Sequence, residues 1–220
     1  MTTTPLEFPP QIDFVYFVSH YAHDLRSPFN RMMGFLKIIL KGQDGPLTDL
    51  QKEDLTTVYQ NSVYAFTMVA NLIEISRLLL GEKSLSLAEA GVASLFQEAI
   101  TLWQKYHSDL PVQFETHLSD ELAPIQADGV LLSQAIAGLI ACVVECVKSP
   151  VLVTLAAEEQ PDGVVVTVRS TGQPAPNPSH LDLDSYGYIS QTLISLHGGE
   201  LRLKEAGDEG AVIQFVLPRN

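Results

Sequence analysis

The sequence predicts an α+β protein in which a helical hairpin is followed by an α/β sandwich with a mixed sheet. Two observations lead to this fold class. The N-terminal third carries apolar residues at helical spacing in two long runs, and the rest of the chain alternates strand and helix signals. With 220 residues, 46% of them hydrophobic and 18% charged, the chain is long and apolar enough for one large or two small globular cores.

The first helix is predicted from near Gln11 to near Lys41, because apolar residues recur there in steps of four and three. This stripe consists of Val18, Ala22, Leu25, Phe29, Met32, Leu36 and Ile39. His23 lies one residue off the stripe, where an imidazole meets solvent and a visiting protein. Pro28 deprives the carbonyl of Asp24 of its amide partner, so we expect the helix to bend or loosen below the histidine.

A second helix is predicted from about Thr48 to Leu80, after the turn at residues 42–46. Its apolar face is broad enough to pack against more than one neighbour. The residues of this face are Leu55, Val58, Ala65, Phe66, Val69, Leu72, Ile73 and Leu79. A hairpin cannot bury so wide a face alone, so we expect two copies to form a homodimeric four-helix bundle.

Three segments follow from this pattern. Residues 1–10, with three prolines, are expected to form a flexible arm, residues 11–82 the helical hairpin, and residues 83–220 the α/β sandwich. Helices in the sandwich are predicted at 92–106, from the N-cap Asp128 to Val147, and at 188–196. Extended segments are predicted at 84–88, 112–118, 151–157, 164–169, 200–204 and 212–217, and a further short one is predicted to end at Ala127.

The composition limits the partners and the compartment. A net charge of −13 argues against nucleic acid and anionic membrane surfaces, which need a basic footprint. Cys142 and Cys146 indicate small buried residues on one helix of a reduced protein, and they lack further ligands for a metal site. No apolar run approaches the roughly twenty residues that cross a bilayer, and the start of the chain has no signal-peptide pattern. We therefore expect a cytoplasmic protein that receives its signal from another protein.

The segment Ala22–Phe29 reads Ala-His-Asp-Leu-Arg-Ser-Pro-Phe. It resembles the histidine box of two-component sensor histidine kinases, whose usual form is Ser-His-Glu-Leu-Arg-Thr-Pro-Leu. The resemblance implies that His23 is phosphorylated, that Asp24 helps as a base and that Ser27 assists dephosphorylation, while Arg26 meets the transferred charge. Imidazole suits such a role, because it titrates near neutrality and is nucleophile and leaving group in turn.

Residues 83–220 are similar to the ATP-binding domain of the same kinases, a Bergerat-type α/β sandwich. The scaffold positions match at Leu132, Gln134, the segment 196–199 and the final strand through Pro218. The chemical positions depart from the family. Two asparagines, the second of which holds magnesium in the family, are replaced by Gly138 and Cys142, and neither offers the oxygen that a hard cation needs.

The glycine boxes depart as well. The first box aligns with residues 170–174, where Ser170 replaces the aspartate that reads adenine, Gly172 remains and Pro174 replaces the second glycine. Of the second box only Gly187 remains, and residues 173–183 form a short segment with three prolines in place of a flexible nucleotide lid. A triphosphate needs glycine amides and a cation, so we expect a degenerate ATP-binding domain without a bound cofactor or metal.

The sequence therefore predicts a histidine phosphotransferase that exchanges a phosphoryl group between His23 and the aspartate of a response-regulator receiver domain. One alternative is a divergent kinase that autophosphorylates His23 with ATP and magnesium; another is a non-catalytic adaptor that binds and blocks a kinase or regulator. An upstream kinase or sensor protein is a further candidate partner. His20 and Asp24 are spaced four apart on the first helix, but two ligands are too few for a metal, so His20 is expected to be an exposed neighbour of His23.

Overall fold

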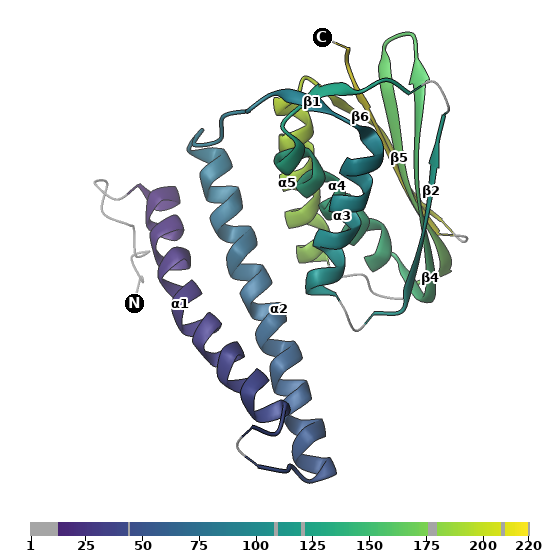
Figure 1. The fold of residues 1–220 in the computed structure, drawn as a ribbon. Helices are drawn as coiled ribbons and strands as arrows, with labels where there is room; N and C mark the ends of the chain where they lie inside the picture. Colours follow the sequence, from purple (N-terminus) through teal and green to yellow (C-terminus); the bar gives the residue numbers. More distant parts are fainter. Residues whose placement is uncertain are drawn as a thin grey trace, which may run out of the picture. The chain divides into compact units, whose positions relative to one another are not determined.

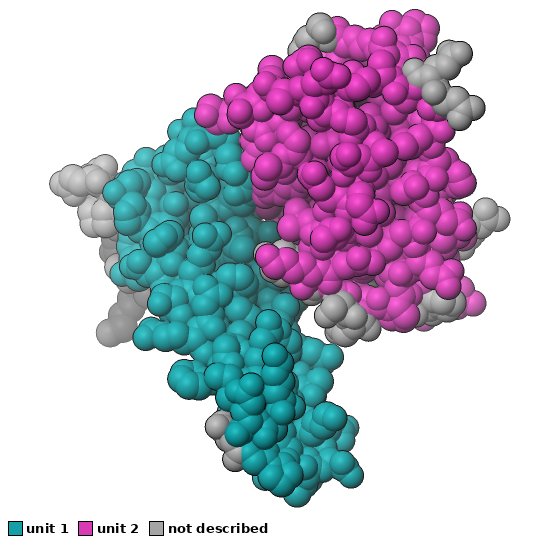
Figure 2. Space-filling model, viewed as in Figure 1, with its two compact units in different colours: residues 1–83 teal, residues 84–220 magenta. Residues whose placement is uncertain are grey.

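The computed structural model describes residues 13–43, 45–107, 110–119, 122–175, 180–207 and 210–219. The chain divides into two compact units, unit 1 (residues 1–83) and unit 2 (residues 84–220), shown in Figures 1 and 2. The arm predicted at residues 1–10 lies outside the described residues.

Unit 1 is the predicted helical hairpin, formed by α1 (Phe14–Leu40) and α2 (Asp49–Leu79), which lie side by side in Figure 1. The carboxylate of Asp13 caps α1 by accepting hydrogen bonds from the amides of Val15 (2.9 Å) and Tyr16 (3.1 Å). A capping box of Thr48 and Gln51 begins α2. The helix α1 continues through Pro28, although this residue removes one of its hydrogen bonds.

The apolar surface of the hairpin is only partly buried within one chain. Ala22, Val69 and Ile73 form a buried cluster against which Phe29 packs. Other residues of the predicted stripe and face are exposed, namely Leu25, Met32, Val58, Leu72 and Leu79. The hairpin of one chain therefore leaves large apolar side chains of both helices exposed.

One described helix, α2, is long and apolar enough by length and composition to cross a membrane. The sequence contains no uninterrupted apolar run of this length, so no such segment was predicted; α2 reaches this level with uncharged polar residues among apolar ones. Two of these, Ser62 and Ser76, are buried and donate hydrogen bonds to the carbonyls of Val58 (2.7 Å) and Leu72 (2.8 Å). These two serines are buried on the same helix as Val69 and Ile73, and such burial is also expected of a helix packed in a bundle.

Unit 2 is the predicted α/β sandwich. Its elements are β1 (Ala88–Ala90), α3 (Val92–Tyr106), β2 (Val112–Leu118), β3 (Ile125–Ala127), α4 (Gly129–Glu145), β4 (Val147–Gln160), β5 (Gly163–Pro174), α5 (His180–Leu196), β6 (Glu200–Gly207) and β7 (Gly210–Leu217). The main sheet has the order β2-β4-β5-β7-β6, with β2 and β4 parallel and the other pairs antiparallel. Figure 1 shows α3, α4 and α5 on one face of this sheet. The prediction of a mixed sheet is confirmed.

The core of unit 2 lies between the sheet and its three helices. The strand β4 alternates as expected for a sheet covered on one face: Val151, Val153 and Leu155 are buried, and the residues between them are half-buried. The helix α4 is apolar on almost every side and correspondingly buried between its neighbours. This helix is the element around which the candidate nucleotide site would be built.

Two elements near that site differ from the prediction. The strand β5 continues to Pro174 instead of ending at Arg169, because its last residues pair with the start of β4, Gln173 opposite Lys148. The helix α5 begins at His180 instead of Tyr188, so the residues up to Gly187 are helical and not a loop. Glycine and proline suggested a loop in both places, and tertiary packing outweighs these local preferences. Pro176 and Pro178 of the predicted lid lie outside the described residues.

Candidate functional site

His23 lies on the exposed side of α1. The preceding residue, Ala22, is buried against Val69 and Ile73, and this contact fixes the rotation of the helix. The His23 side chain is 73% exposed, and its Nδ1 lies 3.8 Å from Oδ1 of the still more exposed Asp24. This distance is too long for a hydrogen bond. In the tautomer whose proton is on Nδ1, the side that faces the carboxylate, Nε2 carries the lone pair.

Arg26 and Ser27 follow within one helical turn, and both are exposed. Ser27 is four residues after His23, so it lies on the same side of the helix one turn further on. From Leu25 to Lys41 the chain contains four basic residues and no acidic one: Arg26, Arg31, Lys37 and Lys41, all exposed. The ammonium of Lys37 is 5.6 Å from the ring centre of Tyr59 on α2. The half of α1 that follows His23 therefore carries a positive surface, and His23 lies at its end.

His20 lies one turn before His23 and is also exposed. Its Nδ1 lies 3.2 Å from the carbonyl oxygen of Tyr16, and the two rings lie 4.1 Å apart between their centres. The hydrogen bond ties the ring to its own helix. Among the residues that the structure describes, no group of three or more His, Cys, Asp or Glu side chains is arranged to hold a metal ion.

In unit 2, α5 packs directly on α4 at Gly138. A side chain at this position would collide with the hydroxyl of Ser190, and its first carbon would lie 3.5 Å from the carbonyl oxygen of Tyr186. Cys142, one turn further along α4, is buried. At the two positions where the family resemblance implies asparagines, α4 thus offers no oxygen ligand, and α5 fills the space that a side chain at position 138 would need.

Ser170, in the place of the adenine-reading aspartate, is only 2% exposed. Its hydroxyl donates a hydrogen bond to the carbonyl of Val143 on α4 (2.7 Å) and accepts one from the amide of Ala211 on β7 (3.2 Å). Both bonds join elements of the sandwich. In this arrangement the Ser170 hydroxyl is used for packing, and its lone pairs and proton are not directed at a ligand.

The two remaining glycines lie within a strand and a helix. Gly172 belongs to β5 and lies where its pairing with β4 shifts register, between the paired residues Thr171 and Gln173, and beyond it the amide of Ala175 donates to the carbonyl of Cys146 (2.9 Å). Gly187 lies inside α5. Backbone amides within a helix are engaged by its own carbonyls, so neither glycine belongs to the open loop that a phosphate-binding box requires.

A hydrogen-bonded clasp at the start of α4 was not predicted as a unit. Asp128 accepts hydrogen bonds from the amides of Leu131 (3.1 Å) and Ser86 (2.9 Å), and its own amide donates to Nε2 of His197 (3.1 Å). Burial acts to raise the pKa of Asp128, but the amides of Ser86, Leu131 and Val130 and the imidazole of His197 together hold this pKa below its ordinary value. The sequence indicated Asp128 as an N-cap, whereas its contact with a histidine 69 positions away depends on the tertiary fold.

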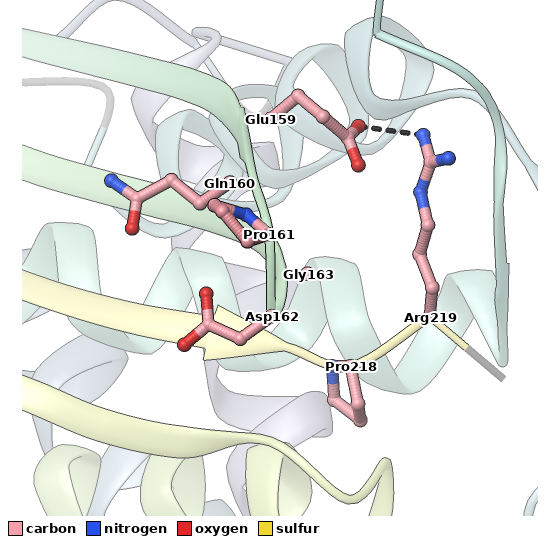
Figure 3. Close-up of a pocket in the computed structure, with 7 residues that line it drawn as sticks. All are labelled: Glu159, Gln160, Pro161, Asp162, Gly163, Pro218 and Arg219. Atoms are coloured by element: carbon pink, nitrogen blue, oxygen red, sulfur yellow. Dashed lines mark hydrogen bonds and ion pairs between the residues drawn. The ribbon is translucent and has the colours of Figure 1, made fainter.

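A pocket at the turn between β4 and β5 is shown in Figure 3, lined by residues 159–163, Pro218 and Arg219. Arg219 pairs with Glu159 at 2.6 Å, the interaction drawn as a dashed line. The second carboxylate, that of Asp162, pairs with Arg202 of β6. Both carboxylates are therefore neutralised by arginines, and we assign no chemistry to this pocket.

Comparison with known proteins identifies relatives for both units. Residues 15–81 match the His Kinase A (phospho-acceptor) domain. Over 92% of its length, the chain is 20% identical to the circadian input-output histidine kinase CikA of Synechococcus elongatus. The aligned region is 29% of CikA, so the chain spans less than a third of that relative.

Solved structures of histidine kinases share the fold. The crystal structure of full-length ShkA in complex with AMPPNP aligns with a TM-score of 0.69 at 21% identity, covering 92% of this chain and 45% of ShkA. Histidine kinase ThkA, in its complex with the response regulator TrrA, aligns with a TM-score of 0.60 at 20% identity, covering 93% of this chain and 61% of ThkA. The hairpin contains a phospho-acceptor domain, the mixed-sheet sandwich shares the fold of histidine-kinase structures, and the chain is similar over most of its length to two-component sensor histidine kinases.

Proposed function

We propose that this protein is a histidine phosphotransferase of a two-component system. In this proposal His23 accepts a phosphoryl group from the aspartate of a response-regulator receiver domain and returns it to such an aspartate, and ATP binding by unit 2 is weak or lost. The observation that carries the proposal is the packing of α5 on α4 at Gly138, where the family's nucleotide site would be built. His23, in contrast, is exposed on unit 1.

Three features of unit 2 support weak or lost ATP binding. Gly138 and Cys142 provide no oxygen for magnesium. Gly172 and Gly187 lie in a strand and a helix, so among the described residues neither glycine offers the amide of an open loop to a triphosphate. Residues 84–220 contain 17 acidic and 6 basic residues, a net charge of −11, which disfavours a polyanionic ligand. The residues present therefore do not fit magnesium-bound ATP.

The chemistry at His23 needs no nucleotide. The lone pair of Nε2 attacks the phosphorus of the receiver's aspartyl phosphate, the bond to the carboxylate oxygen breaks, and the aspartate leaves as a carboxylate. Asp24 stabilises the charge that develops on the ring, because its carboxylate faces Nδ1. Arg26 attracts the phosphoryl oxygens, and Ser27 positions water when the phosphoryl group is hydrolysed. In the resembling systems the receiver domain supplies its own magnesium.

The surface around His23 supports a receiver domain as the partner. Three exposed basic residues of α1 follow His23 and a fourth, Lys41, is its C-cap, so this surface attracts the negative charge of a receiver's aspartyl phosphate. The relative ThkA has been crystallised with a response regulator. The exposed apolar residues of α1 and α2 support the second partner in the proposal, another copy of the chain.

A second candidate function is ATP-dependent autophosphorylation of His23. It is favoured by the fold shared with ShkA, whose structure contains the nucleotide analogue AMPPNP. The two functions differ in the source of the phosphoryl group. Under the leading proposal, purified protein incubated with labelled ATP and magnesium stays unlabelled, and it becomes labelled when mixed with a phosphorylated receiver domain.

The His23→Ala variant and a panel of receivers complete this test. Label transferred from a receiver should be lost in His23→Ala. Strong labelling by ATP that disappears in His23→Ala would replace the proposal with the kinase function. If no phosphorylated receiver in the panel labels the wild-type chain, the remaining function is that of an adaptor that binds a kinase or regulator without phosphoryl transfer.

A further inference from the structure

A second imidazole on α1 has its nucleophilic nitrogen available. His20 is exposed, and its Nδ1 lies 3.2 Å from the carbonyl oxygen of Tyr16. A carbonyl oxygen only accepts hydrogen bonds, so Nδ1 carries the proton of the neutral ring. The lone pair is then on Nε2, the far side of the ring from this hydrogen bond.

The ring of His20 is also held in place. Its centre lies 4.1 Å from that of the Tyr16 ring, with 40° between the planes. His23 makes a looser contact, since its Nδ1 is 3.8 Å from the Asp24 carboxylate. The hydrogen bond and ring contact therefore orient His20, with Nε2 outward, more firmly than the carboxylate orients His23.

The two imidazoles lie close together on the helix. Three residues correspond to about 4.5 Å along the axis and about 60° around it, so a donor that reaches His23 approaches His20 after a shift of less than one turn. Along the chain, His20 precedes His23, whereas Arg26 and the other basic residues follow it. They would orient a donor toward His23 first.

We propose that His20 is a second phosphoryl-accepting residue, served by the same class of donor as His23, the aspartyl phosphate of a receiver domain. This inference rests on the proposed function. The Nε2 lone pair of His20 attacks phosphorus, the bond between phosphorus and the carboxylate oxygen breaks, and the aspartate leaves as a carboxylate. The ring keeps its Nδ1 proton and becomes cationic, a form that the Tyr16 carbonyl and aromatic ring stabilise. In the reverse step the neutral imidazole leaves.

The experiment mixes a labelled, phosphorylated receiver with four chains: wild type, His23→Ala, His20→Ala/His23→Ala and His23→Ala/His117→Ala. We expect His23→Ala to be labelled about 10²-fold more slowly than wild type, because the acceptor is displaced from the favoured position. The double variant that lacks His20 should show only background label. His117 is an exposed histidine of unit 2, so its additional loss should leave the residual label unchanged.

The outcomes separate the two proposals. A wild-type chain that no receiver labels contradicts the proposed function itself. Labelling of wild type with only background in His23→Ala contradicts the role of His20 and leaves the proposed function intact. Residual label that mass spectrometry maps to His117 would show unspecific modification and also contradict it. His20→Gln/His23→Ala, which retains a hydrogen-bond donor but no nucleophile, should lose the label with α1 still helical by circular dichroism.

Discussion

The rotation of α1 decides which residues near His23 take part in chemistry. Ala22 is turned into the hairpin, and the next two residues are consequently turned toward solvent. The imidazole of His23 can therefore meet a partner, and the carboxylate beside it is that of the next residue, Asp24. In the proposed reaction Asp24 acts through His23, because its distance to Nδ1 allows electrostatic support but no hydrogen bond.

We expect Asp24→Asn to slow phosphoryl transfer between a receiver and His23 by about 10²-fold, because the charge that develops on the ring loses its counter-charge. The rate at which label leaves a phosphorylated receiver measures this effect. Glu53→Gln makes the same change of charge at an exposed position of α2 and should leave the rate unaltered. Equal rates for Asp24→Asn and wild type would remove Asp24 from the mechanism.

Gly138 is the residue on which the proposed loss of nucleotide binding depends most. Replacing it with asparagine introduces the side chain that the family resemblance implies there, but the amide group has to enter the contact between α4 and α5 beside Ser190. We expect Gly138→Asn to lower the free energy of unfolding of unit 2 by about 1–3 kcal/mol, as for other overpacked cores, and to gain no ATP binding.

Urea unfolding and a fluorescent ATP analogue measure the two effects. Gly91→Asn is the matched control, because nothing lies within 4 Å of a side-chain carbon built there and asparagine is a favoured N-cap for α3. Its stability should equal or slightly exceed that of wild type. If Gly138→Asn bound the analogue at unchanged stability, α5 would not be a fixed obstacle and the case for lost nucleotide binding would fail.

At the scale of elements, the sequence predicts best where the pattern is local and long. The hairpin follows from the spacing of apolar residues such as Ala22 and Val69, and the strands of the sheet follow from alternation such as that of Val151, Val153 and Leu155. These patterns are repeated over several turns or residues. A single glycine or proline does not disturb them, as the passage of α1 through Pro28 illustrates.

The elements that contain residues 170–187 were predicted less well. Gly172 and Gly187 each suggested a loop, because glycine weakens strands and helices and is common in phosphate-binding boxes. In the fold, Gly172 lies in β5 at a shift of its register with β4, and Gly187 lies inside α5, which packs on α4 at Gly138. Both contacts join segments that are distant in the chain, and a single sequence contains no direct sign of them.

The clasp at Asp128 makes a prediction about α4. The folded-state pKa of this carboxyl is lower than its ordinary value of 3.8, so the ionised form stabilises unit 2. This stabilisation is complete above the unfolded-state pKa and is lost as the pH falls through the folded-state pKa. We expect Asp128→Ala to cost about 1 kcal/mol at neutral pH through the lost cap, and the difference from wild type to shrink in strong acid.

Thermal unfolding between pH 7 and pH 2 measures this difference. Asp128→Asn retains an acceptor for the amides of Leu131 and Ser86 and should lose less stability than Asp128→Ala at neutral pH. It should also show a weaker pH dependence than wild type, because it has no carboxyl to protonate. A difference between Asp128→Ala and wild type that stays constant down to pH 2 would contradict the assigned pKa direction.

At the scale of the whole molecule, charge is divided unevenly between the two units. Residues 13–83 contain 8 acidic and 7 basic residues, a net charge of −1, whereas residues 84–220 carry −11. An acidic receiver domain is therefore repelled by unit 2 and attracted to the basic half of α1. The division directs the partner of the proposed reaction to the unit that holds His23.

Apolar surface is also divided, and it leads to the last prediction. Val58, Leu72 and Leu79 are exposed at separations of seven or fourteen residues, so they lie along one side of α2, and Leu72 is 48% exposed. A second hairpin that covered this side would complete a four-helix bundle.

We expect a homodimer of the 24.1 kDa chain in light scattering, and a monomer for Leu72→Arg, because the substitution would bury an unpaired charge in the bundle. Leu118→Arg, at an exposed position of β2, should remain dimeric with unchanged molar mass. A wild-type chain that is monomeric at micromolar concentration would leave the exposed stripe of α2 without its proposed partner.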